Sequence, residues 1–535
     1  MIDTVILCGG DSLSDCDHAP LEDPKNQHVA EAYWQWIEEQ IRQSTAPYLL
    51  ANGHYSVYSI PEHGPIECLI DRLRPLLHQY HATAYICGHD HNLKPILVTI
   101  ADLPQPYATS SASKGPRITP VPADPLIYVP DGFTVNLYMS GLISPRYLIY
   151  TPTNDILVSE SSINRISCLV DNDQDGYPDQ RLTFADASNG LNYPFGMVFA
   201  NGYFYVGSRD AIRRYSWTSG SRQITGTGEI IMNYAENGHS TRTIVISPND
   251  YRMFVSIGSA SNVDVELLPR ASVQQANLDG SNQTTFAYGL RNAVGLAFHP
   301  ITNDLYATCQ ERDGLGDDLV PDYFTRIQQN DFYGWPFAYM SANLTDPRRR
   351  LNNGTSERPD LVSITRTPDV LFQAHSAVLD MRFYTGNQFP SRYRNGVFTA
   401  FHGSWNRNNG TGYKIIFIPF NNNTNRPMGY YEDFVNGFLI NPPGPDTFGR
   451  PVGILVLKDG SLLFSEDGNN RLYQIQYKQS FTNTNNISSI ISSTVATINT
   501  VTDIITIHFQ NSAVTPPLSL FVYTFCFYLF FSQHN

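Results

Sequence analysis

Three histidines near the start of the chain have the setting of metal ligands. His89 and His91 lie one residue apart in I-C-G-H-D-H-N-L, directly after a short apolar run, and His54 follows a similar run in L-L-A-N-G-H. Neutral imidazole is a common ligand of transition metals in proteins. Imidazoles on loops after buried strands could therefore hold metal ions that activate a water molecule.

A second group of candidate residues lies further along the chain, in G-H-S-T-R and Y-G-L-R-N. His239 precedes a predicted strand, and an imidazole that titrates near neutrality could take a proton from a substrate hydroxyl. Arg242 and Arg291 supply fixed positive charge beside turns, and Asn292 supplies an amide that donates and accepts. A single histidine beside a strand is more often structural, so these residues alone do not establish a base.

Two acidic segments could bind cations. E-R-D-G-L-G-D-D-L is too acidic and too rich in glycine for a strand interior, so we expect a loop that exposes backbone carbonyls to a hard cation. Asp317 and Asp318 in it could instead cap the loop or bind a second calcium. D-N-D-Q-D-G-Y-P-D resembles the front of a calcium loop, but the closing position is Leu182 instead of glutamate. A weak calcium site and a solvated acidic turn both stay open there.

The elements that must position these residues are strands that repeat one plan. An alternating apolar strand meets a turn of Pro, Asn, Asp or Gly, and a second alternating strand follows. The copies are residues 145–161, 195–208, 243–259, 294–310, 379–403 and 452–467. The first four start about 50 residues apart, which is enough for a four-stranded sheet each, and six such sheets arranged radially make a β-propeller. Residues 134–141 could close the ring beside 471–477, and separate β-sandwiches fit this spacing less well.

The predicted fold class is mainly β, a six-bladed propeller preceded by a truncated α/β fragment. Two helical patterns, at about 29–42 and 65–79, pack on a small sheet in that fragment. The predicted divisions are a fragment at 1–110, a linker at 111–124, the propeller at 125–478, a Ser/Thr/Asn-rich stalk at 479–513 and a hydrophobic tail at 514–535.

Several features bear on where the protein works. Asparagines that begin N-x-S/T sequons, which favour export, are Asn282, Asn343, Asn353, Asn409, Asn422 and Asn486. The N-terminus shows no signal peptide. The apolar stretch 518–531 is shorter than the roughly 20 residues that cross a bilayer. It follows a small triplet at 511–513, so a lipid anchor, a marginal membrane tail and a terminus without function stay open. We expect an extracellular or cell-surface protein.

Composition and cysteine spacing exclude some classes of function. Lys and Arg number 35 against 49 Asp and Glu, and the net charge of −14 repels nucleic acid. The 7 cysteines contain no C-x-x-C pair, which argues against a zinc knuckle or a dithiol redox site.

The histidine motifs A-N-G-H-Y-S-V-Y-S-I-P-E-H-G-P and A-Y-I-C-G-H-D-H-N-L resemble the C-terminal half of the tartrate-resistant (purple) acid phosphatases, which are metallophosphoesterases. The resemblance implies that His54, His89 and His91 are ligands of an Fe, Zn or Mn pair and that His63 lies near the substrate phosphate. That family also uses carboxylate, tyrosine and asparagine ligands from its N-terminal half, which this sequence lacks. Three neutral imidazoles cannot balance two multivalent cations, so we expect an inactive remnant without metals unless another chain completes the site.

The motifs G-H-S-T-R, Y-G-L-R-N, E-R-D-G-L-G-D-D-L and A-F-H-G-S-W-N-R, in this order, resemble the glucose/sorbosone dehydrogenase family. Its members are six-bladed propellers that use pyrroloquinoline quinone (PQQ) and calcium, and the sorbosone branch is the more similar one. The resemblance implies His239 and Arg291 as catalytic residues. It implies cofactor contacts from Arg242, Arg291, Asn292, Arg407, Lys414 and Arg450, and calcium held by the carbonyls of Asp313 and Gly314.

The function that these resemblances favour is oxidation of a sugar or a related polyol or aldehyde, dependent on PQQ and calcium. The partners would be a sugar substrate and an external electron acceptor, and the oligomeric state is unknown. A non-catalytic propeller that binds glycan or protein is one alternative. Metal-dependent phosphomonoester hydrolysis is another.

Overall fold

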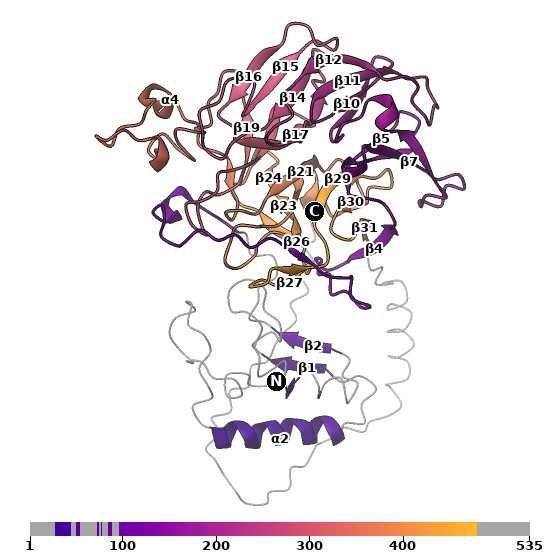
Figure 1. Ribbon diagram of the computed structural model, residues 1–535. Helices are drawn as coiled ribbons and strands as arrows, with labels where there is room; N and C mark the ends of the chain where they lie inside the picture. The colour runs from indigo at the N-terminus through magenta and orange to yellow at the C-terminus, as the bar shows by residue number, and fades with distance from the viewer. Residues whose placement is uncertain are drawn as a thin grey trace, which may run out of the picture. The chain divides into compact units, whose positions relative to one another are not determined.

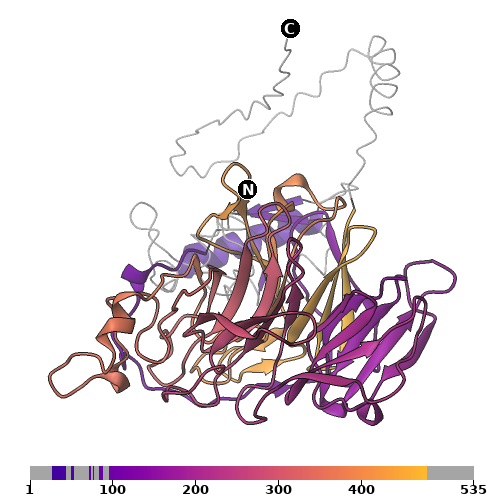
Figure 2. The same ribbon diagram turned by 90° about the horizontal axis from the view of Figure 1, so that it is seen from above.

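The computed structural model describes residues 27–43, 50–53, 72–73, 76, 84–87 and 96–478, and its main feature is six four-stranded antiparallel sheets. The sheets lie around a common centre, so each is one blade of a propeller (Figure 1). Figure 2 shows the same blades after a turn of 90°.

The blades are built in chain order, with one exception in the last. Blade 1 is β5 (Pro145–Tyr150), β6 (Ile156–Glu160), β7 (Arg165–Val170) and β8 (Gln180–Ala185). Blade 2 is β9 (Met197–Ala200), β10 (Tyr203–Gly207), β11 (Ala211–Ser216) and β12 (Glu229–Asn233). Blade 3 is β13 (Ile244–Ile246), β14 (Met253–Ile257), β15 (Ser272–Ala276) and β16 (Thr284–Tyr288).

Blade 4 is β17 (Asn292–Phe298), β18 (Leu305–Gln310), β19 (Tyr323–Ile327) and β20 (Val370–Leu371). Blade 5 is β21 (Val378–Phe383), β22 (Val397–Phe401), β23 (Lys414–Ile418) and β26 (Glu432–Val435). Blade 6 is β29 (Pro451–Val456), β30 (Leu462–Glu466), β31 (Arg471–Tyr477) and β4 (Phe133–Met139).

The repeated hairpins of the sequence are the first two strands of each blade. The expected ring closure is confirmed, because β4 pairs antiparallel with β31 from Phe133 opposite Tyr477 to Met139 opposite Leu472. One sheet thus contains strands from both ends of the propeller, which removes two open sheet edges.

Buried hydroxyl groups fasten the inner strands of neighbouring blades. Thr308 Oγ1 on β18 accepts a hydrogen bond from the Gly295 amide at 2.8 Å and donates to the Leu379 carbonyl of blade 5 at 2.7 Å. Ser465 makes the same pair of contacts between blades 6 and 1, with the Gly453 amide and the Arg146 carbonyl. Because buried backbone groups must be paired, these hydroxyls fix where the inner strands end and so where the loops above them begin.

The first part of the chain contains a small α/β unit. Helix α2 (Gln27–Gln43) confirms the first predicted helix, and strands β1 (Leu50–Gly53) and β2 (Ala84–Cys87) pair in parallel as two strands of the predicted sheet. Helix α2 is amphipathic, with buried side chains at Ala30, Trp34, Ile37 and Ile41. Most of the second predicted helix lies outside the described residues. No helix in the described part of the chain is long and apolar enough to span a membrane.

Shorter elements lie in the connections. A three-stranded sheet joins β27 (Leu439–Asn441), β28 (Asp446–Thr447) and β3 (Arg117–Ile118), and a two-stranded one joins β24 (Phe420–Asn421) and β25 (Arg426–Pro427). The insertion before β20 contains helix α4 (Pro359–Ser363).

Candidate active site

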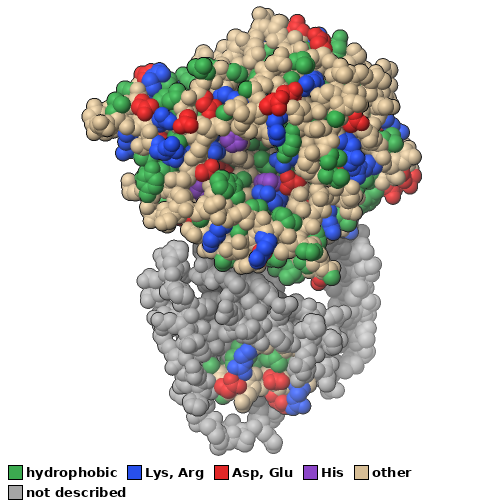
Figure 3. Space-filling view, in the orientation of Figure 1, with side chains coloured by type: hydrophobic (Ala, Val, Ile, Leu, Met, Phe, Trp, Pro, Cys, Tyr) green, Lys and Arg blue, Asp and Glu red, His purple; other side chains and the backbone are tan. Residues whose placement is uncertain are grey.

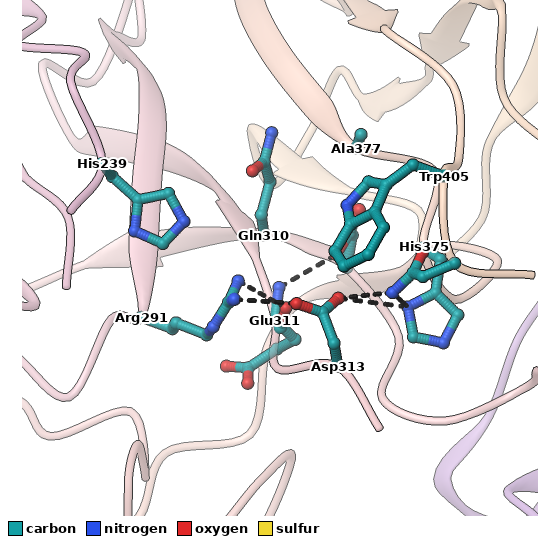
Figure 4. Close-up of a pocket in the computed structure, with 10 residues that line it drawn as sticks. His239, Arg291, Gln310, Glu311, Asp313, His375, Ala377 and Trp405 are labelled. Atoms are coloured by element: carbon teal, nitrogen blue, oxygen red, sulfur yellow. Dashed lines mark hydrogen bonds and ion pairs between the residues drawn. The ribbon is translucent and has the colours of Figure 1, made fainter. Parts of the chain in front are cut away.

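One pocket gathers polar side chains at the end of the propeller where the second strand of a blade connects to the third, and where one blade connects to the next. Its volume is about 120 Å³, and it is lined by His239, Arg291, Gln310, Glu311, Asp313, Asp322, His375, Ala377, Trp405 and Asn406. Histidine side chains lie beside acidic and basic ones near the middle of the propeller face in Figure 3. Figure 4 shows His239 and Arg291 on one side of the pocket, with Trp405 and His375 on the other.

The tautomer of His239 follows from its backbone partner. Its Nδ1 lies 2.8 Å from the carbonyl oxygen of Ser259, which can only accept, so Nδ1 carries the proton and donates. Nε2 is then the unprotonated nitrogen. Burial, followed by the positive charge of Arg291, lowers the pKa of His239 to about 4. The imidazole is therefore neutral, with a free lone pair, across the physiological pH range.

Gly258 lets two candidate residues approach each other. A Cβ atom at this position would lie 2.3 Å from Asn292 Oδ1 and 2.7 Å from His239 Cβ, so any larger residue would displace one of them. Asn292 donates from Nδ2 to Gln310 Oε1 at 2.9 Å, whereas its Oδ1 is buried without a partner in the described structure. This orphaned acceptor lies next to His239 and suits a bound ligand that donates.

Arg291 is held rigidly at the pocket wall. Its guanidinium donates to the Glu311 carbonyl at 2.8 Å and to Asp313 Oδ2 at 3.0 Å, and it contacts both side-chain and main-chain oxygens of Asn262. The residue is only 7% exposed. A planar, fixed cation of this kind can stabilise negative charge that develops on a ligand oxygen.

The opposite wall comes from the connections before and within blade 5. Asn406 donates from Nδ2 to Asp313 Oδ1 at 2.5 Å, and His375 donates from Nε2 to the Gly316 carbonyl at 2.9 Å. Trp405 is 48% exposed at this wall, although tryptophan is usually well buried. An exposed indole beside fixed polar groups is suited to stack on a flat ring system.

Two buried carboxyl groups line the floor. Burial raises the pKa of Glu311 to about 8 and that of Asp322 to about 7. Asp322 accepts from the Glu311 amide at 2.9 Å, and Glu311 Oε1 has no partner in the described part of the chain. At neutral pH the Glu311 carboxyl is therefore mainly uncharged.

The structure brings His239 and Arg291 into this pocket, with Asn292 next to His239. Arg242 is fully buried outside the lining and donates to the carbonyls of His239, Thr241 and Arg209, so it supports the loop that carries His239.

Three further predicted cofactor contacts are not among the residues that line the pocket, and each is bonded to another group of the chain. Arg407 pairs with Asp318 at 2.5 Å. Lys414 pairs with Asp433 at 2.6 Å. Arg450 donates to the carbonyls of His402 and Gly403, at 3.1 and 3.3 Å.

Of the residues predicted to bind metal, Asp313 lines the pocket and Gly314 does not. The Asp313 carbonyl accepts from Asn262 Nδ2 at 2.9 Å. Within the described residues, one acidic or histidine cluster has its ligand atoms within 4.8 Å of one another, and it is Asp171, Asp173 and Asp179, away from the pocket. His54, His63, His89 and His91 lie outside the described residues.

The segment before the propeller contributes to the site. Residues 107–119, here named the strap, are mostly exposed as expected of a linker, but they bind two site loops. Thr109 Oγ1 accepts from the Asp317 amide at 2.7 Å, and the Lys114 amide donates to the Trp405 carbonyl at 2.6 Å. The strap thus joins the loop of Asp313 to the loop of Trp405.

Sequence reasoning missed seven lining residues: Gln310, Glu311, Asp322, His375, Ala377, Trp405 and Asn406. Glu311, Trp405 and Asn406 lie in the motifs E-R-D-G-L-G-D-D-L and A-F-H-G-S-W-N-R that carried the resemblance, so their place in these motifs was a usable signal. Asp322 has no such signal, because only the folding of its loop brings it beneath Glu311.

A family model described as TrAA12-like matches residues 127–478, which is the whole ring of blades. The chain belongs to this family. The PQQ-dependent sugar dehydrogenase of Hypocrea jecorina is 23% identical to this TrAA12-like chain over 397 residues, which cover 65% of this chain and 88% of that one. A protein of Borreliella burgdorferi is 30% identical over 370 residues, covering 66% of this chain and 91% of its own length.

Solved structures of similar proteins have the same fold as this TrAA12-like chain. The Trichoderma reesei carbohydrate-active enzyme of family AA12 superposes with a TM-score of 0.57 at 20% identity, covering 68% of this chain and 100% of that one. The PQQ domain of the Coprinopsis cinerea pyranose dehydrogenase, in its holo form, gives 0.55 at 19% identity, with 68% and 100% coverage. These similarities confirm the β-propeller fold.

The N-terminal resemblance is also found. Rat tartrate-resistant acid phosphatase type 5 is 46% identical over 94 residues, which are 18% of this chain and 28% of that enzyme. The TrAA12-like chain therefore spans less than a third of the length of this relative.

Proposed function

We propose that the protein is a PQQ-dependent oxidoreductase that oxidises a sugar hydroxyl or a hydrated aldehyde. The observation that carries this proposal is that a neutral imidazole and a buried guanidinium line one pocket in a chain of the TrAA12-like family. Two similar proteins, the Hypocrea jecorina sugar dehydrogenase and the Coprinopsis cinerea pyranose dehydrogenase, are both named for PQQ.

The residues present fit PQQ at one end of the pocket. Arg291 offers buried donors, Trp405 offers a flat surface, and Glu311 Oε1 is a buried polar atom of the lining without a partner. Asn292 Oδ1, next to His239 but outside the lining, is a second buried polar atom without a partner among the described residues. When bound, PQQ would supply a quinone that accepts two electrons as hydride. Calcium on the carbonyls of Asp313 and Gly314 stays a prediction. Among the described pocket residues, no three acidic or histidine side chains bring their ligand atoms within 4.8 Å of one another to add to such a site.

The chain's own residues would perform the proton chemistry. His239 Nε2 takes the proton of the reacting hydroxyl while its Nδ1 stays bonded to Ser259, which keeps the ring in one orientation. Arg291 places positive charge where negative charge develops, and the Asp313 carboxylate holds the guanidinium in place. PQQ, when bound, would accept the two electrons of the sugar carbon as hydride, and an external acceptor would reoxidise it.

Loading purified protein with PQQ and calcium tests this function. We expect PQQ-dependent reduction of an artificial electron-accepting dye when aldoses are added, together with a thermal shift on PQQ binding. The proposal would be contradicted if the loaded protein showed no dye reduction with any aldose and no thermal shift when PQQ is added.

Ionisation of the Glu311 carboxyl should make PQQ binding depend on pH. Its folded pKa of about 8 lies above the ordinary 4.5, so the folded state binds the proton more tightly, and this carboxyl destabilises the fold as pH rises from about 5 to 8. Ionisation also puts negative charge on the floor of the pocket, which would repel an anionic cofactor such as PQQ. We expect PQQ affinity, measured by fluorescence titration, to fall about tenfold between about pH 7 and 9.

Glu311→Gln is the matched control for that titration, because an amide of the same shape cannot ionise. The variant should show a smaller fall of PQQ affinity between the two pH values, with the remainder due to Asp322, whose pKa of about 7 lies near the same range. An unchanged fall of affinity in Glu311→Gln would assign the effect to another group.

The N-terminal fragment and the exported location stay proposals. We propose that this chain has negligible phosphatase activity, because the three neutral imidazoles of His54, His89 and His91 do not balance two multivalent cations. Aryl phosphate hydrolysis that is lost in His89→Ala would contradict this. Exposure of the sequon residues Asn282, Asn343, Asn353, Asn409 and Asn422 supports an exported glycoprotein. Mass spectrometry before and after deglycosylation would test it.

A further inference from the structure

A second cavity lies at the opposite end of the blades from the candidate active site. Its volume is about 370 Å³, and it lies between blades 2 and 3. Its wall includes Asn201 before β10, Asp250 and Tyr251 between β13 and β14, and Asp279 between β15 and β16. In an antiparallel blade these turns all lie at the end opposite to the connection between the second and third strands, which forms the candidate active site.

Tyr251 occupies a turn position that is asparagine or glycine in the other five blades. The residue two positions before the second strand of every blade has a positive φ, and these residues are Asn154, Asn201, Tyr251, Asn303, Asn395 and Gly460. Asparagine and glycine tolerate this left-handed conformation, whereas a bulky aromatic residue is strained there. Tyr251 has a φ of 53° and is 60% exposed, so burial of its ring within the chain does not offset the strain. Strain of this kind collects at sites that contact ligands.

The charges of the cavity are balanced. Its two arginines, Arg214 and Arg252, are matched by Asp250 and Asp279. Arg214 is also paired with Glu229 at 2.7 Å, and Arg252 donates to the carbonyls of Ala276 and Asn282. A site without excess charge does not favour an anion or a cation.

The remaining lining is aromatic and hydrogen-bonding. Tyr203, Tyr205 and Tyr251 supply rings, and Leu278 is the one aliphatic residue among the described lining residues. Within the described part of the chain, the Arg252 amide donates to Oδ1 of Asp250 and Ser281 donates to Oδ1 of Asp279, which leaves Oδ2 of each carboxylate to accept. Both carboxylates are exposed, so a ligand with donors such as hydroxyl groups would gain hydrogen bonds there that an apolar ligand would not.

We propose that this cavity binds a neutral saccharide unit, with the ring of Tyr251 packed on the apolar face of the sugar. Saccharides present C–H groups on the faces of the ring and hydroxyl groups around its edge. The exposed ring of Tyr251 can pack on the C–H groups, and the Oδ2 atoms of Asp250 and Asp279 can accept from the hydroxyl groups. This site would hold a carbohydrate chain at the end of the propeller remote from His239, and it does not depend on the proposed oxidation.

Binding of neutral oligosaccharides to the full chain tests the proposal. Calorimetric titration would use the gluco-, xylo-, manno- and galacto-oligosaccharide series, with Tyr251→Phe as the matched control that keeps the ring. We expect at least one series to bind, with a dissociation constant raised at least tenfold in Tyr251→Gly and within about twofold of the parent in Tyr251→Phe.

The melting temperature and PQQ binding of the Tyr251→Gly variant show whether it is folded. Tyr251→Gly relieves the left-handed strain, so its melting temperature should equal or exceed that of the parent, which excludes misfolding as the cause of lost binding. PQQ binding at the other end should be unchanged. The proposal is overturned if no neutral series binds, if Tyr251→Gly binds as well as the parent, or if only anionic saccharides or peptides bind.

Discussion

Replacing His239 with asparagine should reduce the turnover number by about 10²- to 10⁴-fold and leave PQQ binding nearly unchanged. The amide nitrogen of asparagine occupies the position of Nδ1 and can still donate to Ser259, so the loop keeps its anchor. The atom that is lost is Nε2, the proposed proton acceptor. Single-turnover reduction of PQQ-loaded protein by an aldose measures the loss directly.

The pH dependence of the unsubstituted protein supplies a second check on the same atom. Because the pKa of His239 is lowered to about 4, the neutral imidazole persists down to that pH, and kcat/KM should fall on the acid side near 4 rather than near 6.5.

A matched control for this substitution is His299→Asn. His299 is a buried imidazole in the first hairpin of blade 4, where Nδ1 accepts from the amides of Ile301 and Thr302, and the Oδ1 of asparagine can accept there in its place. We expect it to retain turnover. If His239→Asn kept full turnover, or if both variants lost it equally, His239 would not be the base.

Replacing Arg291 with methionine should have the second large effect, a loss of about 10²- to 10³-fold in kcat/KM together with weaker PQQ binding. The substitution removes the cation and leaves the Asp313 carboxylate, which is 3.0 Å from the guanidinium, without its ion pair. Adding Asp313→Asn should recover stability, because the unpaired charge is gone, but should not recover turnover. Urea denaturation and steady-state kinetics separate the two effects.

Arg165→Met controls for loss of an arginine pair in general. Arg165 pairs with the buried Glu160 at 2.9 Å in blade 1, outside the pocket. We expect lower stability with unchanged PQQ affinity. Equal PQQ affinity in the Arg291 and Arg165 variants would contradict a role of Arg291 in the site.

Much of the fold could be predicted because its signals are local. Each blade begins with two alternating strands and a turn, and strand alternation and turn residues are both written in consecutive positions. Ring closure by β4 and β31 was also predictable, since a propeller without it leaves two open edges. The α2 helix was predictable from the spacing of its apolar residues.

The candidate site was predictable only in part, because charge pairing depends on residues distant in sequence. Lys414 is an ordinary candidate for a carboxylate partner until Asp433 of the neighbouring strand β26 is seen to take its charge. The strap is a second example. Its composition indicates a linker, whereas its contacts with Asp317 and Trp405 arise from the path that the chain takes across the propeller.

The most direct test of the central claim is a crystal structure of the purified protein with PQQ. We predict that the cofactor lies in the pocket between Arg291 and Trp405, with a quinone oxygen within hydrogen-bonding distance of the Arg291 guanidinium and the reacting face open to His239 Nε2. Density for PQQ at any other place, or a pocket in which His239 and Arg291 contact different ligands, would contradict it.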